Sequence, residues 1–507
     1  MEGIKKPKIL LINPPQTVYP ASIGLFVGLP LGLMYMAAVL DRAGFETEIL
    51  DTLVRKCERI KMAGAEHYGM SFENIGKEIA ERKPDIVGIN GATMPHIENA
   101  IRTAEIAKKI SPKILTVIGG NDATVRTEAL LRENPAIDVV VRGEGEYTLL
   151  EIAENWNGTL SGIRGIRGIA YMENKEVKFN EPRPFIQNLD ELPFPAYHLV
   201  NMEDYFNPEK KVELWGGGAH LRDIPFITSR GCPMRCCFCS IHLHMGRQWR
   251  AHSAEYVIRH LKHVIENYRV EHIHFDDDNI ALDKQRLHKI LDGIAAEKLK
   301  FTWDTPNGIR ADRLDMDLLV KMKKTGCELL IISPESGDQW VLDNIVHKAL
   351  NLGDVENVAA MCQKLKIPLG ALFIIGFPDE TREQIQHTID FALMLTRKYD
   401  VQWRGIIIAV PMFGTEMHEI CRKRNYIASE LTPQSLSEAM YAGGRPLITT
   451  PEFTPEEITA IALAANRAGN TLHLRKYLKH PALALMLIAK QPKRPVWFIK
   501  KLLRGRK

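Results

Sequence analysis

Short apolar runs alternate with segments of helical periodicity over roughly the first third of the chain. The runs are too short for helices, and they are rich in the β-branched residues that buried strands favour. Segments of helical length, such as 31–43, 96–109 and 128–134, lie between them. This alternation predicts a doubly wound parallel sheet with helices on both faces. The predicted strands are Ile9–Ile12, Thr47–Leu50, Asp85–Ile89, Ile114–Ile118 and Asp138–Val141.

The same alternation resumes near residue 224 and continues to about residue 410. Helical segments fit between the apolar runs, and Ser253 is placed to cap one that extends to Tyr268. Six such repeats predict a partial (β/α)6 TIM barrel, with functional residues at the carboxyl ends of its strands. The predicted strands are Ile224–Ile227, Glu271–Phe275, Lys300–Trp303, Glu328–Ile332, Leu369–Ile375 and Trp403–Ala409.

The remaining segments predict a connector and a helical extension. Residues 156–220 are rich in Gly, Pro and charged residues. Near the C-terminus, Thr454-Pro-Glu-Glu457 has the pattern of a capping box with proline at the first helical position, so a helix should begin at Pro455. The predicted organisation is therefore an N-terminal sheet domain, a connector, a barrel and a helical C-terminal region, with the bounds 1–155, 156–220, 221–425 and 426–507.

The last residues carry most of the positive charge. The chain has a net charge of +4, yet Thr471–Lys507 contains many Lys and Arg and no Asp or Glu. Apolar and aromatic residues interleave with these cations, as in an interfacial helix on anionic lipid. A helical appendage with a solvated basic face is the alternative. Nucleic acid is not an expected partner, because no recognition motif accompanies the charge.

The composition indicates in which cellular compartment the protein lies and which classes of protein can be excluded. No apolar run reaches the ~20 residues of a membrane-spanning helix, and the N-terminus does not resemble a secretory signal. The eight cysteines are too sparse in 507 residues for a disulfide framework. We expect a cytoplasmic protein, with a peripheral contact at the inner membrane face through the basic tail.

Half of the cysteines lie in one short loop, directly after the predicted strand Ile224–Ile227. Cys232, Cys236 and Cys239 form a C-x3-C-x2-C pattern, which lets one loop place three thiolates around an iron–sulfur cluster. Three ligands leave one iron of a cubane cluster open for reaction chemistry. A structural zinc site is the alternative, but zinc sites usually pair two separated half-sites. Cys237 is too close to its neighbours to complete either geometry.

This loop resembles that of the radical S-adenosylmethionine (SAM) enzymes, in which an aromatic residue precedes the last cysteine, here Phe238. The resemblance implies a [4Fe-4S] cluster on the three cysteines and SAM on the open iron. It implies that Asp276 and Glu335 hold SAM, that Arg310 lies near the SAM carboxylate, and that the Gly376-Phe-Pro-x-Glu motif lies beside the adenine. The alternative is that these strand ends are ordinary solvated turns, which would have no role in binding SAM.

The N-terminal strand ends carry glycine and small polar residues, as ligand sites do, although strand-to-helix turns favour the same residues. Their motifs are Asn13-Pro-Pro15, Pro30-Leu-Gly-Leu33, Gly119-Gly-Asn-Asp-Ala-Thr124 and Gly143-Glu-Gly-Glu146. They resemble the cobalamin-binding domain that precedes the radical SAM domain in one large subfamily. The implied cofactor contacts are Asn13, Gly91, Thr93, Gly119, Gly120, Gly143, Glu144 and Gly145.

Two departures from the subfamily pattern affect the cobalt site. The D-x-H-x-x-G signature, whose histidine ligates cobalt, is absent, so the lower axial ligand is open. Asp122 stands where relatives often have histidine.

The resemblance implies a cobalamin-dependent radical SAM methyltransferase that acts on an unactivated carbon, with no side chain assigned as catalytic. The basic tail favours an apolar or lipid-like small-molecule substrate, as in hopanoid methylases or magnesium-porphyrin cyclases. An external donor of the flavodoxin or ferredoxin type would supply electrons. The alternatives are a non-methylating radical cyclase or oxidoreductase and a non-catalytic iron–sulfur or corrinoid sensor. A methylthiotransferase would need a second cysteine triad, whereas the N-terminal domain holds only Cys57.

Overall fold

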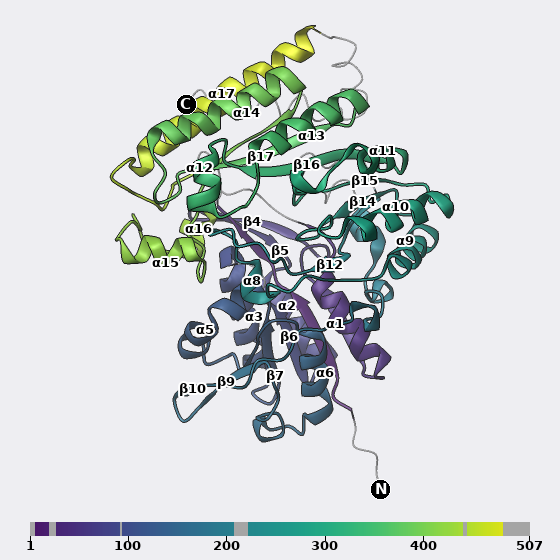
Figure 1. The fold of residues 1–507 in the computed structure, drawn as a ribbon. Coiled ribbons are helices and arrows are strands. Elements are labelled where there is room, and N and C mark those ends of the chain that lie inside the picture. Colours follow the sequence, from purple (N-terminus) through teal and green to yellow (C-terminus); the bar gives the residue numbers. More distant parts are fainter. Residues whose placement is uncertain (1–5, 20–26, 92–93, 207–221, 440–443, 480–507) are drawn as a thin grey trace.

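The computed structural model describes residues 6–19, 27–91, 94–206, 222–439 and 444–479. Figure 1 shows two α/β regions stacked on each other, with the N-terminal region in the lower part of the view and the barrel-like region above it. Long helices, including α14 and α17, cover the far end of the upper region. The predicted fold class is confirmed: a parallel α/β sheet, then a second parallel sheet with outer helices, then a helical C-terminal region.

The N-terminal sheet has the strand order β10-β9-β8-β7-β6-β1-β3. Its five predicted strands are all present and parallel. Alternate residues of β1 enter different cores: Ile9 and Leu11 pack with α1 and α6, whereas Leu10 and Ile12 pack with α2, α3 and α5. Burial on both faces explains why these strands are continuous apolar runs. The parallel strands are β1 Ile9–Asn13, β3 Thr47–Asp51, β6 Ile86–Asn90, β7 Leu115–Gly119 and β8 Val139–Val141.

Helices and short turns link these strands. The α-helices are α1 Leu31–Arg42, α2 Phe72–Arg82, α3 Ile97–Ile110, α4 Asn121–Val125, α5 Thr127–Glu133 and α6 Glu146–Asn155. The 3-10 turns here and in the following segment are η1 Met94–His96, η2 Leu160–Gly162, η3 Leu189–Glu191 and η4 Tyr197–Leu199, followed by α7 Met202–Phe206.

Two features of this region differ from the organisation that the sequence predicts. Strands β9 Ile169–Glu173 and β10 Glu176–Phe179 come from the predicted connector, and they extend the sheet in antiparallel fashion beyond β8. A separate three-stranded sheet joins β2 Gln16–Val18, β5 Ala65–Gly69 and β4 Glu58–Met62. Every residue of β4 is exposed, including the apolar Ile60 and Met62, and the sequence analysis did not predict this strand.

The upper region contains six parallel strands in the order β11-β14-β15-β16-β17-β18, which confirms the predicted partial barrel. A short antiparallel pair, β12 with β13, lies beside its first strand. The strands are β11 Asp223–Phe226, β12 Ser229–Arg230, β13 Arg250–Ala251, β14 His272–Phe275, β15 Thr302–Asp304, β16 Cys327–Glu335, β17 Leu369–Ile375 and β18 Gln402–Ile408.

Helices α9, α10, α11, α13 and α14 of the upper region pack side by side in sequence order, whereas α8 packs on α4 of the N-terminal region. The helices of this region are α8 Ile241–His244, α9 Ala254–Tyr268, α10 Lys284–Ala296, η5 Ala311–Arg313, α11 Met316–Lys324, α12 Gln339–Val341, η6 Leu342–Val346, α13 Leu352–Leu365 and α14 Arg382–Tyr399. The C-terminal ones are α15 Glu416–Lys423, α16 Pro433–Ala439 and α17 Pro455–Lys479. Within the described ranges, no helix is long and apolar enough to cross a bilayer.

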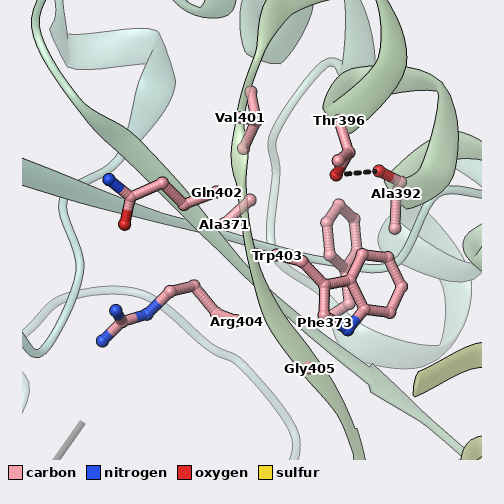
Figure 2. A pocket seen from close by; sticks show the side chains of 9 residues that line it. All are labelled: Ala371, Phe373, Ala392, Thr396, Val401, Gln402, Trp403, Arg404 and Gly405. Atoms are coloured by element: carbon pink, nitrogen blue, oxygen red, sulfur yellow. Dashed lines mark hydrogen bonds between the residues drawn. The ribbon is translucent and has the colours of Figure 1, made fainter. Parts of the chain in front are cut away.

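A small pocket lies where β17 and β18 pack on α14. Trp403 and Phe373 both line it, and Figure 2 shows the Thr396 hydroxyl directed to the carbonyl of Ala392. The lining contains none of the residues predicted to bind a cofactor. We therefore assign this pocket to side-chain packing.

The last described helix, α17, packs on the edge of the barrel sheet, and an amide side chain of this helix hydrogen-bonds to the edge strand. Asn466 Oδ1 accepts hydrogen bonds from Ile406 N (2.8 Å) and Trp403 Nε1 (3.2 Å), and its Nδ2 donates to Ile406 O (3.0 Å). The amide thus replaces the neighbouring strand that β18 lacks at this edge. Close approach is possible because Gly469 faces the same indole, where a Cβ would lie 2.0 Å from Trp403 Cδ2.

Replacing Asn466 should destabilise the fold without weakening the helix itself. Asn466→Ala leaves one N–H, one carbonyl and the indole N–H without their partner, which costs about 2 kcal/mol of unfolding free energy. Alanine favours the helix, so the matched control Glu456→Ala, at an exposed position of α17, should be nearly neutral. Urea unfolding measures both variants, and equal stability of the two would contradict this role.

Candidate functional site

The cysteine loop begins at the carboxyl end of the first barrel strand. Cys232, Cys236 and Cys239 are free and half-buried, whereas Cys237 is only 3% exposed and packs in the main apolar core. The backbone of Cys237 is fixed on both sides, because its N–H donates to Val346 O (3.0 Å) and its carbonyl accepts from Met417 N (3.0 Å). The environment thus separates Cys237 from the three cysteines predicted as ligands, whose role as ligands stays a prediction.

Burial also changes the pKa of thiol groups in this loop. It raises the pKa of Cys236 and raises that of Cys239 to about 11. Both are therefore protonated at neutral pH in the absence of metal. A bound cluster would displace these protons, since thiolates are the ligands of iron.

The segment before Cys232 is held by the acidic run that follows β14. Asp277 Oδ1 accepts hydrogen bonds from the Thr228 N–H (3.1 Å) and the Thr228 hydroxyl (2.7 Å). Asp278 Oδ2 accepts one from Gly231 N (3.0 Å). Gly231 has φ +79°, and a Cβ there would lie 2.5 Å from the carbonyl oxygen of Gln248. The sequence showed this acidic run at a strand end but gave no sign that it holds the loop.

Three residues predicted to hold SAM lie at neighbouring strand ends. Glu335 ends β16 at φ +72°, and its Oε1 accepts a hydrogen bond from Lys348 Nζ (2.8 Å) in a buried ion pair. Arg310 donates to the carbonyls of Lys348 (2.8 Å) and Ala349 (2.7 Å), so it fixes the same turn. The charges of Lys348, Glu335 and Arg310 all act on the pKa of Cys236, which places them near the loop.

This group pairs two cations with two carboxylates, because Arg310 also contacts Asp312 (Nε to Oδ1, 2.9 Å). Within it, the Glu335–Lys348 pair complements the ammonium and the carboxylate of an amino acid zwitterion. Lys348 was missed in the sequence, where an isolated lysine in a turn gives no signal. Asp276, predicted to hold SAM with Glu335, directly follows β14, and burial raises its pKa to about 7. The individual contacts of Asp276, Glu335 and Arg310 with SAM stay predictions.

The fifth-strand motif lies against the cysteine loop. The rings of Phe238 and Phe377 are in contact, with centroids 5.9 Å apart. Gly376 has φ +82°, and the fully buried Glu380 accepts hydrogen bonds from Gly376 N (2.6 Å) and Phe377 N (3.1 Å). Burial raises the pKa of Glu380 to about 8, so the carboxyl group is largely protonated at neutral pH. Glu380 therefore shapes the turn that presents the Phe377 ring to Phe238.

The residues predicted to contact cobalamin lie at the carboxyl edge of the N-terminal sheet, except Thr93, which is outside the described residues. The parallel strand order β3-β1-β6-β7-β8 reverses direction between β1 and β6, and this switch point is where open sheets bind ligands. Asn13 is held there by Asp51 (3.1 Å) and by Asn90 (3.1 Å). The others at this edge are Gly91, Gly119, Gly120, Gly143, Glu144 and Gly145.

The residues predicted to contact cobalamin differ in how closely other protein atoms surround them. A Cβ on Gly91 or Gly145 would meet protein atoms, at 3.0 Å (Ile118) and 2.9 Å (Met36), so close packing explains both glycines. At Gly119 a Cβ would lie 3.6 Å from Val141, an ordinary contact distance, so packing does not require glycine there. The carboxylate of Glu144 is engaged by two arginines and by Ile186 N (2.7 Å).

One histidine at this edge was not singled out in the sequence. His96 Nδ1 is buried and has no hydrogen-bond partner among the described residues. Burial lowers the pKa of His96 to about 4, so the ring is neutral at physiological pH. A neutral imidazole with an unsatisfied nitrogen fits an edge that takes a polar cofactor. Asp122, by contrast, pairs with Arg126 (2.6 Å) in the same helix.

A second cluster of potential metal ligands lies within the barrel sheet. Ligand atoms of His272, His274 and Asp304 all fall within 4.8 Å of one another. However, His274 Nδ1 is hydrogen-bonded to Asp304 (2.7 Å), and its Nε2 lies 3.7 Å from Asp223. Burial lowers the pKa of His274, but the hydrogen bonds to Asp223 and Asp304 outweigh it and raise this pKa to about 10. A proton thus occupies the cluster at neutral pH, and we assign it as a buried ion pair.

Because of this ion pair, the free energy of unfolding should decrease at alkaline pH. The folded-state pKa of His274 is raised above 6.5, so its stabilisation is complete below that value and is lost as the pH rises through about 10. His274→Gln should cost about 3 kcal/mol at neutral pH, because it removes the cation that both Asp223 and Asp304 contact, and it should flatten the alkaline loss. Urea unfolding over this pH range is the measurement, with His288→Gln as the control. A variant that kept the wild-type pH profile would exclude His274 as its source.

The buried position of Cys237 gives an expectation for the cysteine loop. After anaerobic reconstitution, Cys236→Ala should lose its iron, whereas Cys237→Ala should retain it and lose only about 1 kcal/mol of stability from the small cavity. Iron and sulfide counts with electron paramagnetic resonance (EPR) spectra test this. Iron loss in Cys237→Ala alone would show that the ligand set is wrong.

Family models match both regions of the chain. Residues 24–153 match the B12 binding domain, and residues 226–392 match the Radical SAM superfamily. Two solved structures share the fold. The first is OxsB with aqua-cobalamin and S-adenosylmethionine bound, which has a TM-score of 0.67 and 17% identity and covers 99% of this chain and 71% of its own. The second is TsrM from Kitasatospora setae with tryptophan and a SAM analogue bound, which has a TM-score of 0.64 and 17% identity and covers 83% of this chain and 77% of its own.

Sequence relatives extend over almost the whole chain. A cytidylyl-2-hydroxyethylphosphonate methyltransferase of Streptomyces wedmorensis is 29% identical, over 93% of this chain and 91% of the relative. An uncharacterized methyltransferase of Pyrococcus horikoshii is 34% identical, over 90% of this chain and 91% of the relative. With that identity over that length, and with both domains matched in order, the chain belongs to the cobalamin-binding radical SAM family.

Proposed function

We propose that this protein is a cobalamin-dependent radical SAM methyltransferase that methylates an unactivated carbon of a small molecule. The observation that carries the proposal is the arrangement of two cofactor edges. The carboxyl edge of the N-terminal sheet, with Glu144 and Glu146, meets the carboxyl end of the barrel, with Arg230, at one buried seam. Helix α4 after β7 also packs on α8, which follows Cys239.

An sp³ carbon has no acidic proton and no lone pair, so ordinary SAM methylation cannot reach it. When bound, the cluster with SAM and the corrin supply a carbon-centred radical and a transferable methyl group. The protein has to hold the two sources close together and dry. In this chain Cys232, Cys236 and Cys239 would hold the cluster, with the Glu335–Lys348 pair beside Cys236.

Apolar packing supports exclusion of water from the cluster side. Phe377 is fully buried and Phe238 packs against the same core, so the ring pair closes the space between the cysteine loop and β17. On the corrin side, Asn13 offers polar contacts at the strand ends. The side chains thus orient and enclose, and none has to act as a catalytic acid or base.

Relatives differ in what their names say they act on. Besides the phosphonate methyltransferase, a hopanoid C-3 methylase of Methylococcus capsulatus is 26% identical over 75% of this chain and 66% of the relative. For this chain, an apolar or lipid-like substrate and a peripheral membrane contact are proposed from the basic tail, most of which lies outside the described residues. An external flavodoxin or ferredoxin as electron donor is likewise a proposal.

The reaction class can be tested on the reconstituted holoprotein. Under reducing anaerobic conditions with methyl-labelled SAM, it should form 5′-deoxyadenosine and, with candidate lipids or nucleotidyl phosphonates, a product heavier by the labelled methyl group. Mass spectrometry measures both. Product without label would indicate a radical cyclase or oxidoreductase, and absence of 5′-deoxyadenosine would leave a non-catalytic sensor.

The tail can be tested separately, because α17 ends at Lys479. A chain truncated after Lys479 keeps this helix and removes the rest of the basic segment. Its affinity for vesicles of anionic phospholipid should fall by about 100-fold or more, since each lost cation near the surface contributes about 1 kcal/mol. Vesicles of neutral phospholipid are the control. Unchanged binding to anionic vesicles would remove the lipid proposal.

A further inference from the structure

Two arginines and two glutamates form a buried ion network between the two regions of the chain. Arg230 lies between Glu144 (Nη1 to Oε1, 2.9 Å) and Glu146 (Nη2 to Oε1, 2.7 Å). Arg250 Nη1 contacts the same Glu144 at 2.7 Å. Their side chains are 9% exposed or less. The network crosses the seam from the corrin-binding edge to the barrel.

Charges buried this deeply have little net stabilising effect, because their desolvation offsets the attraction between them. Two cations face two anions, so the network is neutral as a whole. Aromatic rings of Tyr35 and Phe185 lie over the two guanidinium groups, at 5.4 Å from Arg230 and 4.8 Å from Arg250. A closed network of this kind fixes geometry more than it adds stability.

On the barrel side, both arginines hold the cysteine loop. They are direct partners in the two-stranded pair β12 and β13, which brackets the loop. Arg230 is followed by Gly231 and Cys232, and Arg250 Nη2 donates to the carbonyl of Met245 (3.0 Å), at the end of α8. A shift of either guanidinium group would therefore move the loop that carries the predicted cluster ligands.

On the N-terminal side, both glutamates belong to the turn after β8. Glu144 is flanked by Gly143 and Gly145, at the edge predicted to contact cobalamin, and Glu146 begins α6. Glu144 also accepts a hydrogen bond from Ile186 N (2.7 Å), so its position is fixed on a third side. The turn thus links the two predicted cofactor sites through a few side chains.

We propose that Arg230, bridged to Glu144 and Glu146, is a positioning residue that sets the distance and orientation of the cysteine loop relative to the corrin-binding edge. The inference rests on the proposed function, in which the radical source and the methyl source must act on one substrate. Arg230 touches neither cofactor in this assignment. Its loss should let radical formation continue while methyl transfer becomes inefficient.

The test compares variants of the reconstituted holoprotein. Glu146→Gln and Arg230→Gln should retain iron and cobalamin, yet lower the ratio of methylated product to 5′-deoxyadenosine by about tenfold or more, because small misplacements of reacting groups have large effects on rate. Arg230→Lys, which keeps the charge, should restore part of the ratio. The double variant should lose little more than either single variant, since both remove the same contact.

The matched control is Glu151→Gln in the same helix α6. It removes a half-exposed ion pair with Arg183, and neither residue contacts the cysteine loop. Its ratio of product to 5′-deoxyadenosine should equal that of the wild type. A ratio unchanged from this control in both Glu146→Gln and Arg230→Gln would overturn the proposal, as would loss of iron in proportion to loss of product.

A spectroscopic readout separates this inference from the proposed function. The magnetic interaction between the reduced cluster and cob(II)alamin depends on their separation and orientation, and EPR measures it without turnover. It should change in Glu146→Gln and in Arg230→Gln and stay constant in Glu151→Gln. A wild type that makes no methylated product would refute the proposed function alone. An unchanged interaction in both Glu146→Gln and Arg230→Gln would refute the positioning role alone.

Discussion

The structure depends on how one short loop is held at a seam between two sheets. The loop with Cys232, Cys236 and Cys239 contains no long secondary structure, so its shape comes from its neighbours. Asp277 and Asp278 fix its first residues from the barrel, and Glu144 and Glu146 fix them through Arg230 from the N-terminal sheet. Carboxylates on both sides thus determine where a cluster would lie.

The two sheets contribute different kinds of side chains to this seam. The barrel sheet and the five strands β3, β1, β6, β7 and β8 of the N-terminal sheet are parallel, so their loops gather at carboxyl edges, where polar side chains are not needed for the cores. The barrel edge contributes charged pairs such as Glu335 with Lys348, which suit a zwitterion. The N-terminal edge contributes amides, glycines and the neutral His96, which suit a large polar ring system. One fold principle thus supplies two chemically different sites.

Sequence patterns predicted the strands that are buried on both faces, because such strands are short apolar runs between helical segments. They did not predict β4, whose residues are all exposed, or the pairing of β9 and β10 with the N-terminal sheet. The second failure has a clear cause. A strand in a Gly- and Pro-rich segment gives a weak local signal, and which sheet edge it joins depends on contacts far away in sequence.

By itself the sequence determined the cysteine triad, the order of the two sheets and the strand-end motifs, since each is a matter of local spacing. Only the tertiary structure showed that Glu144, offered as a cofactor contact, has its carboxylate bound to Arg230, 86 positions away. It also revealed Lys348 as the partner of Glu335, and the contact between His274 and Asp304. The reason is physical: spacing along a chain fixes which side chains share a face, whereas packing between elements fixes which charges meet.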